Sequence, residues 1–183
     1  MPEDSVVRSG RQALAITVGS GDRPEAESAG GAATERDEIM EAYWLFSRGE
    51  RGYVYSVSLY LPKDFPQISE SLVIAQWRKL CESSGCVPDN PILAVRYEMG
   101  RLQVTRNDEH GKTLLYQGDE EVRGRWLDFR LVTRWERGSE GSVEATLDGR
   151  EIVRYQGPTM YQADRGIPRR RLFISRLVCT ATR

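Results

Sequence analysis

Two pairs of polar side chains have the spacing of neighbours on one face of a β-strand. Arg36 and Glu38 are two residues apart, and so are Gln76 and Arg78, which flank Trp77. Because alternate side chains of a strand point to the same face, each pair would lie on one side of a sheet. A groove lined by guanidinium, amide and aromatic groups suits a sugar chain that carries carboxylates. The alternative is the ordinary polar face of a sheet that is buried on one side only.

Other catalytic and metal-binding motifs are weak or missing. His110 stands in a polar turn, where a lone histidine is usually exposed, and the chain has no Gly-x-Ser-x-Gly nucleophile elbow. Glycosidases need two facing carboxylates, whereas Asp37 and Glu38 are adjacent and would point to opposite faces. Cys81 and Cys86 could close a small disulfide loop or form half of a zinc site, but no second cysteine or histidine pair follows. We expect no metal and no cofactor; a structural calcium stays open, although no calcium loop is present.

The composition indicates one globular domain with an uneven charge. The 183 residues are 39% hydrophobic and carry a net charge of −1, which argues against disorder. No apolar stretch is long enough for a membrane-spanning helix, and the acidic start is unlike a signal peptide. Residues 1–50 have a net charge of −5 and residues 150–183 one of +6. The basic end could bind an anion, but a nucleic-acid-binding domain is usually basic overall.

Short alternating runs broken by turn residues predict strands throughout the chain. The clearest run is 53–61, and the run 125–135 alternates over its whole length. Asp148-Gly149 is a strong hairpin signal, and Met99-Gly100 joins a second hairpin. About ten strands are expected, at 12–18, 35–46, 53–61, 71–77, 92–97, 101–105, 125–135, 142–147, 151–155 and 171–178, with a loop at 20–34. The pattern predicts one antiparallel all-β domain over residues 1–183, with a sandwich, a jelly roll and a barrel as the choices.

A series of segments in this order resembles the heparin-lyase-I-like polysaccharide lyases, which include glucuronan lyases. The resemblance covers nearly the whole chain. Each segment alone is weakly specific for the family, whereas their occurrence in this order is fairly specific. The segments are Arg8–Val18, Gly21–Asp22, Glu35–Ile39, Tyr55–Pro62 with Asp64–Pro66, Ile74–Trp77, Gly124–Phe129, Leu147–Gly149 and Gly157–Tyr161. The resemblance implies a concanavalin-like β-jelly roll with a substrate groove on its concave sheet.

The resemblance also implies β-elimination of an acidic, uronate-containing polysaccharide. This chemistry neutralises the uronate carboxylate, removes the C5 proton with a base and protonates the departing O4 with an acid. Carried over from the family, Arg36 would hold a substrate carboxylate or order the groove, and Glu38 would position Arg36. Gln76 would hydrogen-bond the carboxylate, with Trp77 and Arg78 beside it.

The chain departs from the family pattern at two places. Arg78 stands where the family has a histidine, and an arginine cannot act as the base because it does not deprotonate in a protein. The last strand offers Ser175 and Arg176 instead of a lysine or a tyrosine, which leaves Tyr161 and Tyr155 as acid or base. A tyrosine base needs cations that stabilise the phenolate, and the candidates for this role are Arg154, Arg165 and residues 169–171.

Three functions remain open at this stage. The first is an active polysaccharide lyase, and the second is a degenerate jelly roll that binds acidic glycans without cleaving them. The third is an unrelated concanavalin-like interaction domain. For the first two we expect an acidic polysaccharide as partner, neither nucleic acid nor membrane, and a monomer. The family resemblance implies a secreted or periplasmic protein.

Overall fold

The computed structural model describes residues 1–19, 21–22, 34–42, 47–48, 51–67, 69, 71–79, 90–161 and 172–182. These residues form thirteen strands and no helix, which confirms the all-β prediction. The strands are β1 (Pro2–Glu3), β2 (Ala13–Leu14), β3 (Thr34–Met40), β4 (Ser47–Arg48), β5 (Gly52–Tyr60), β6 (Leu72–Lys79), β7 (Leu93–Glu98), β8 (Arg101–Asp108), β9 (Gly111–Gln117), β10 (Trp126–Arg134), β11 (Ser142–Leu147), β12 (Arg150–Gln156) and β13 (Leu172–Thr182).

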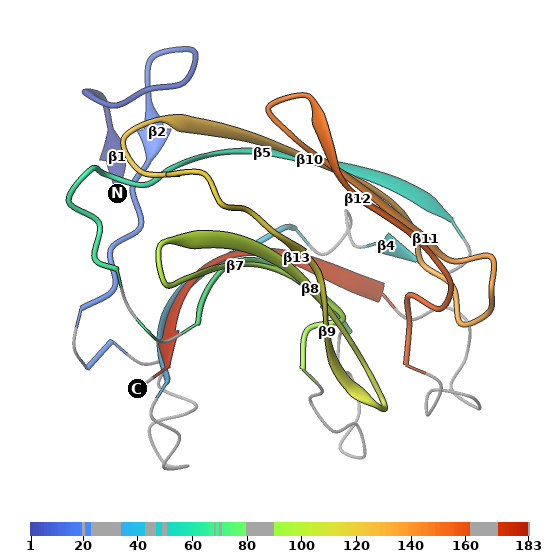
Figure 1. Ribbon diagram of the computed structural model, residues 1–183. Helices are drawn as coiled ribbons and strands as arrows, with labels where there is room; N and C mark the ends of the chain where they lie inside the picture. The colour runs from blue at the N-terminus through green and yellow to red at the C-terminus, as the bar shows by residue number, and fades with distance from the viewer. Residues whose placement is uncertain are drawn as a thin grey trace.

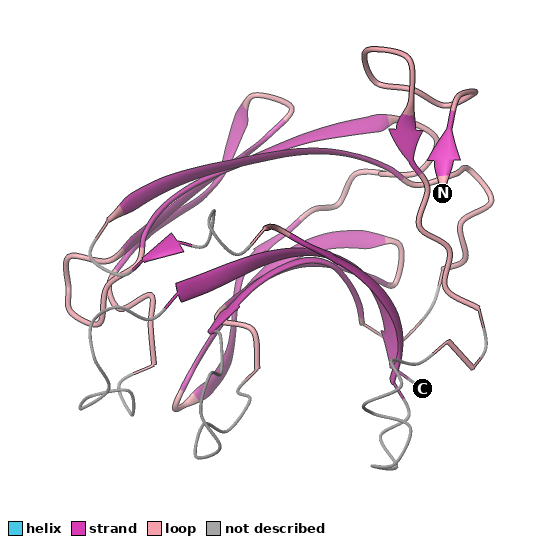
Figure 2. Ribbon diagram, turned by 180° about the vertical axis from the view of Figure 1, so that it is seen from behind, coloured by secondary structure: helices cyan, strands magenta, loops and turns pink. Residues whose placement is uncertain are grey.

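Two antiparallel sheets stack on each other (Figure 1). The larger sheet has the order β3-β13-β6-β7-β8-β9, with β4 also paired to β13. The smaller sheet has the order β12-β11-β10-β5, and β1 pairs with β2 in a separate ribbon. The larger sheet is bent into an arch, and the smaller sheet lies over its convex side; the same arrangement is seen from behind in Figure 2. The concave face of the larger sheet therefore points away from the smaller sheet.

Alternating apolar residues and tight turns explain why the strands form where they do. In β10, Leu127, Phe129 and Leu131 are buried, while the residues between them are more exposed. Met99-Gly100 and Asp148-Gly149 all have positive φ, between 51° and 81°. Two successive residues with positive φ are what a two-residue hairpin turn requires, and glycine takes that conformation without strain. Both predicted hairpins are thus present, as β7–β8 and β11–β12.

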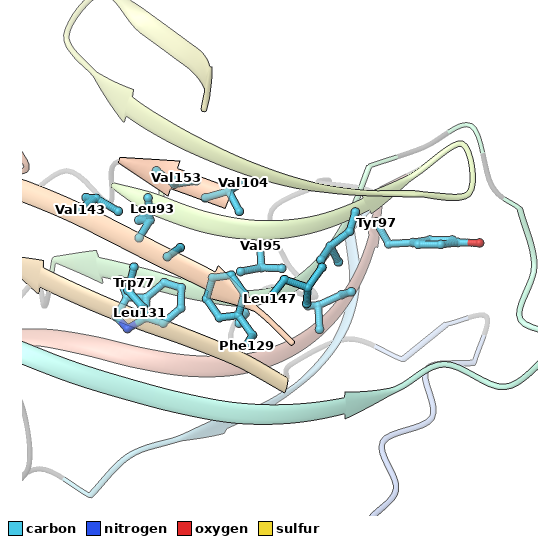
Figure 3. Close-up of a cluster of buried hydrophobic side chains, with 14 of the residues drawn as sticks. Trp77, Leu93, Val95, Tyr97, Val104, Phe129, Leu131, Val143, Leu147 and Val153 are labelled. Carbon is cyan, nitrogen blue, oxygen red and sulfur yellow. The ribbon is translucent and has the colours of Figure 1, made fainter. Parts of the chain in front are cut away.

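The core fills the space between the two sheets (Figure 3). Trp77 from the larger sheet lies against Phe129 of the smaller sheet, with ring centroids 6.5 Å apart, and against Tyr55, at 5.5 Å. Leu93, Val95 and further residues of β7, β8 and β11 complete this layer. Because this side of the larger sheet is covered by the core, polar side chains on its strands collect on the concave side.

Several predicted boundaries differ from the observed strands. The run 12–18 is a strand only at Ala13–Leu14, and 35–46 is a strand only to Met40 within the described residues. The last strand is longer than expected and reaches Thr182. β9 was not predicted, because Leu114, Leu115 and Tyr116 are consecutive and do not alternate. Most of the predicted loop at 20–34 lies outside the described residues.

Candidate functional site

The pairing of the strands places polar side chains in rows across the concave face of the larger sheet. Gln76 of β6 lies opposite Ala94 of β7, which lies opposite Thr105 of β8. Two residues along, Arg96 of β7 lies opposite Gln103 of β8, which lies opposite Gln117 of β9. Two residues along a strand span about 7 Å, so the rows of Gln76 and Arg96 are neighbours. We call these two rows the concave-face rows.

Gln76 is held by a carboxylate from another strand. Its side chain is 6% exposed, and its Nε2 donates a hydrogen bond to Oε1 of Glu38 at 3.3 Å. Glu38 comes from β3, which reaches β6 only through β13 lying between them. The amide of Gln76 is therefore oriented by Glu38, and the prediction that Glu38 also positions Arg36 stays a prediction. Among the described residues, Glu38 is the one hydrogen-bond partner of this amide.

Arg96 is a concave-face residue that sequence reasoning missed. It is half-buried; its Nε donates to Oγ1 of Thr105 at 3.0 Å and its Nη1 to Oγ of Ser71 at 3.4 Å. Burial lowers the pKa of Arg96, and the charge of Glu98 acts in the opposite direction. Within the described part of the chain, no carboxylate oxygen lies within 4.0 Å of its guanidinium. The alternation in 93–98 was the available signal, since Leu93, Val95 and Tyr97 form the apolar face and Arg96 must lie on the other.

Three of the predicted arginines stand on β6, β13 and β3, at one end of the larger sheet. Arg78 is half-buried and follows Gln76 by two residues on β6, which puts it on the same face. Arg176 of β13 lies opposite Gln76 in the sheet. Arg36 of β3 lies opposite Thr180 of β13. The backbone of the sheet thus brings all three predicted positions to the neighbourhood of the concave-face rows.

Two predicted residues are not brought to the concave face. Trp77 is 3% exposed and lies in the core, because adjacent residues of a strand point to opposite faces. Tyr155 belongs to β12 of the smaller sheet and packs against the core; its hydroxyl donates to the carbonyl oxygen of Pro158 at 3.1 Å. The structure therefore does not bring these two side chains together with Gln76 on the concave face.

Tyr161 lies at the edge of the core. Its side chain is 7% exposed, and its hydroxyl donates to the carbonyl oxygen of Asn90 at 3.0 Å, three residues before β7 begins. Of the cations predicted to stabilise a phenolate, Arg154 pairs with Glu151 and Glu144 instead. Arg165 and residues 169–171 lie outside the described residues.

The remaining candidate residues contribute little to the site. His110 is exposed in the turn between β8 and β9, as predicted, and Cys81 and Cys86 lie outside the described residues. The described residues contain no group of three or more histidine, cysteine, aspartate or glutamate side chains that could hold a metal ion. The described part of the chain also has no helix long and apolar enough to cross a membrane.

Comparisons with known proteins identify the same architecture. A family model described as polysaccharide lyase matches residues 3–171. The crystal structure of an endo-β-1,4-glucuronan lyase from the fungus Trichoderma reesei superposes with a TM-score of 0.70 and 17% sequence identity; it covers 100% of this chain and 86% of that chain. A family 7 alginate lyase, A1-II′, in complex with product gives a TM-score of 0.48 and 11% identity over 85% of this chain and 75% of that one. No curated protein matches the chain at a significant level. The structural likeness confirms the predicted jelly-roll fold.

Proposed function

Because the chain belongs to the polysaccharide lyase family, we propose that it cleaves a uronate-containing polysaccharide by β-elimination on the concave face of its larger sheet. The observation that carries this proposal is the buried amide of Gln76, oriented by Glu38, in a row of polar side chains on that face. An arched sheet with polar side chains on its hollow side suits a long sugar chain, which can lie across several strands at once (Figure 1).

β-Elimination places three demands on such a site. The uronate carboxylate must accept hydrogen bonds or meet a positive charge, so that the carbanion formed at C5 is stabilised. A base takes the C5 proton, the electron pair left behind forms the C4–C5 double bond, and the C4–O4 bond breaks. An acid then gives a proton to O4 of the departing sugar.

Gln76 is the residue that we assign to the uronate carboxylate. Its Nε2 carries two hydrogens, of which one is used by Glu38, so the other is available to a carboxylate oxygen. Arg36, Arg78 and Arg176 are proposed to supply positive charge around the same sugar. This assignment is supported for Arg78 and Arg176 by their positions beside Gln76. Arg36 lies two strands away, opposite Thr180 of β13, which pairs with Val73 of β6.

Tyr161 remains our candidate for proton transfer. Its single hydroxyl hydrogen is donated to the carbonyl oxygen of Asn90, so this hydrogen bond has to break before Tyr161 can give the proton to O4. We propose Tyr161 as the acid that protonates O4. Substitution of Tyr161 by Phe removes the hydroxyl and keeps the buried ring, and it should therefore reduce cleavage without unfolding the protein.

The proposed activity is tested by the ultraviolet absorbance of the unsaturated uronate that β-elimination creates. The protein is incubated with glucuronan, alginate, heparin, heparan sulfate and hyaluronan, with and without calcium. A rise in absorbance on one of them is expected and identifies the substrate class. No rise on any of them, for a folded protein, would contradict the proposed activity.

The second candidate function is binding without cleavage, and the observation that favours it is Arg78. An arginine cannot replace a catalytic base at this position. Retardation in an affinity gel that contains one of the same polymers, without any rise in absorbance, would establish it.

We further propose that the protein acts as a monomer and is secreted or periplasmic, since polysaccharide substrates of this kind are met outside the cytoplasm. Light scattering and fractionation of expressing cells test these two points.

A further inference from the structure

We propose that Arg96 binds the carboxylate of a second uronate, on the sugar next to the one held by Gln76. The inference rests on the proposed function and deepens it, because it specifies a polymer with uronates on neighbouring sugars. Such a polymer differs from one in which uronates alternate with uncharged or amino sugars.

The hydrogen bonds of Arg96 leave much of its guanidinium available. An arginine has five N–H hydrogens, and Arg96 uses one on Nε for Thr105 and one on Nη1 for Ser71. Both partners are neutral hydroxyls. None of its nitrogens is among the buried side-chain atoms without a partner, so Nη2, which has no hydrogen-bond partner among the described residues, is not fully buried. The N–H groups of Nη1 and Nη2 form the planar fork that fits a carboxylate.

Partial burial without a counter-ion makes this position favourable for an anion. Taking a charged group out of water costs free energy unless an opposite charge or strong hydrogen bonds compensate. The lowered pKa of Arg96 reflects this burial. The charge of Glu98 acts on the pKa of Arg96, yet the two side chains form no ion pair. A bound carboxylate would supply the missing compensation.

The surroundings of Arg96 fit a sugar ring. Its row continues through Gln103 and Gln117, whose side-chain amides hydrogen-bond each other at 3.2 Å. Both glutamines line an open hollow of about 400 Å³ at the end of the β7–β8 hairpin, together with Glu98, Met99 and Arg101. Neutral amides recognise hydroxyl groups, which every sugar carries. The row therefore offers one guanidinium for a carboxylate and two amides for ring hydroxyls.

Calorimetry with defined oligosaccharides tests the proposal. The probes are the tetrasaccharide of β-1,4-glucuronan, its neutral counterpart cellotetraose, and a hyaluronan tetrasaccharide with alternating uronates. Arg96→Gln should weaken binding of the glucuronan tetrasaccharide by about 10- to 100-fold, since hydrogen bonds to a charged group are lost. It should leave the weaker binding of cellotetraose unchanged, and it should affect hyaluronan less than glucuronan. Arg96→Lys keeps the charge but not the fork, and an intermediate loss is expected.

Arg150→Gln is the matched control, because Arg150 is an exposed arginine of the smaller sheet that pairs with Glu120. It should change binding of each probe by less than about 3-fold. An Arg96→Gln protein that melts like the wild type and binds glucuronan with unchanged affinity would overturn the proposal. So would an equal loss for cellotetraose, which would reveal a purely structural role.

The test separates this inference from the proposed function. Binding that depends on Arg96 without any unsaturated product would uphold the subsite and contradict cleavage. If the protein cleaves glucuronan and Arg96→Gln changes neither the affinity nor KM, cleavage would be upheld and the subsite contradicted. Failure of the wild-type protein to bind glucuronan or alginate oligosaccharides would overturn both.

Discussion

Arg106 and Arg96 lie on opposite faces of the larger sheet and hold their charges in different ways. Arg106, on the core side, has its Nη2 2.8 Å from Oδ2 of Asp108, and its Nη1 donates to the carbonyl oxygen of Pro158 at 3.2 Å. Its guanidinium also lies 4.8 Å from the ring centroid of Tyr155 in the smaller sheet. Arg96, on the concave side, has hydroxyl partners only.

The difference separates a charge that serves the fold from one that is available to a ligand. Arg106 connects β8 to the smaller sheet through Tyr155 and Pro158, and its counter-ion belongs to the same strand. Its Nη1 and Nη2 are used inside the protein, while its buried Nε has no hydrogen-bond partner among the described residues. The comparison teaches that the partners of an arginine withdrawn from water indicate its role. The predictions below test this contrast between the core face and the concave face.

The largest expected effect comes from the core face. Trp77→Ala should lower the free energy of unfolding by about 3–5 kcal/mol, because a large ring is removed from a packed layer. Val54→Ala is the control, since Val54 is 57% exposed on β5, and a change within about 0.5 kcal/mol is expected. Chemical denaturation measures both. Equal effects of the two substitutions would show that Trp77 is not part of the core.

The next largest effect is expected from Asp108→Asn, which should lower the free energy of unfolding by about 3 kcal/mol. The substitution leaves the charge of Arg106 largely buried without its counter-ion, as the two side chains are only 10% and 18% exposed. Glycan binding should stay unchanged. Asp119→Asn removes the exposed partner of Arg101 and should have little effect on unfolding. The contrast between faces would be wrong if Asp108→Asn weakened glycan binding while the protein remained stable.

Gln76→Ala should have its main effect on the concave face. Removal of the amide takes a partner from Glu38 and from the substrate carboxylate, which is worth about 1–3 kcal/mol in kcat/KM or in affinity. Gln156→Ala, an exposed glutamine of the smaller sheet, is the control and should behave like the wild type. The absorbance assay measures kcat/KM, and calorimetry measures the affinity. Unchanged turnover and binding in Gln76→Ala would place the substrate elsewhere.

The smallest effect is expected from an exposed pair on the smaller sheet. Hydrogen bonds from Arg8 and Ser58 lower the pKa of Asp128 to about 2, below its ordinary 3.8. A lowered pKa in the folded state adds stability above pH about 4, and that contribution is lost as the pH falls toward 2. Arg8→Ala should raise this pKa and flatten the acid limb of the stability curve. A carboxyl resonance of Asp128 that still titrates near 2 in the variant would contradict the assignment.

The sequence allowed more of the fold than of the site to be predicted. Alternation and turn chemistry act over a few residues, so β10 and the hairpins at Met99-Gly100 and Asp148-Gly149 were correctly expected. β9 was missed because its apolar residues are consecutive and most of this edge strand is exposed. Strand positions and hairpin turns depend on neighbouring residues, so a single sequence can predict them when the pattern is regular.

The site depends on contacts between distant strands. Glu38 meets Gln76 only because β13 lies between β3 and β6, and nothing in the local pattern of either strand indicates that order. Trp77 could have been assigned correctly, since its neighbour Gln76 was already placed in the groove and adjacent residues face opposite ways. Arg96 was visible in the same manner, as the polar member of an alternating strand.

The position of β13 between β3 and β6 also determines when Glu38 can meet Gln76 during folding. β6, β7, β8 and β9 are joined in chain order, so their pairing closes short loops, whereas β3 must wait for a strand more than a hundred residues away. We therefore expect the β6–β9 half to assemble first and the Glu38–Gln76 contact to be among the last. Pulse-labelled hydrogen exchange should find amides of β7 and β8 protected before those of β3. Simultaneous protection of all three strands would contradict this order. The strands that carry both concave-face rows would then form early, and the contact with Glu38 that orients Gln76 would be the last to form and the first to open.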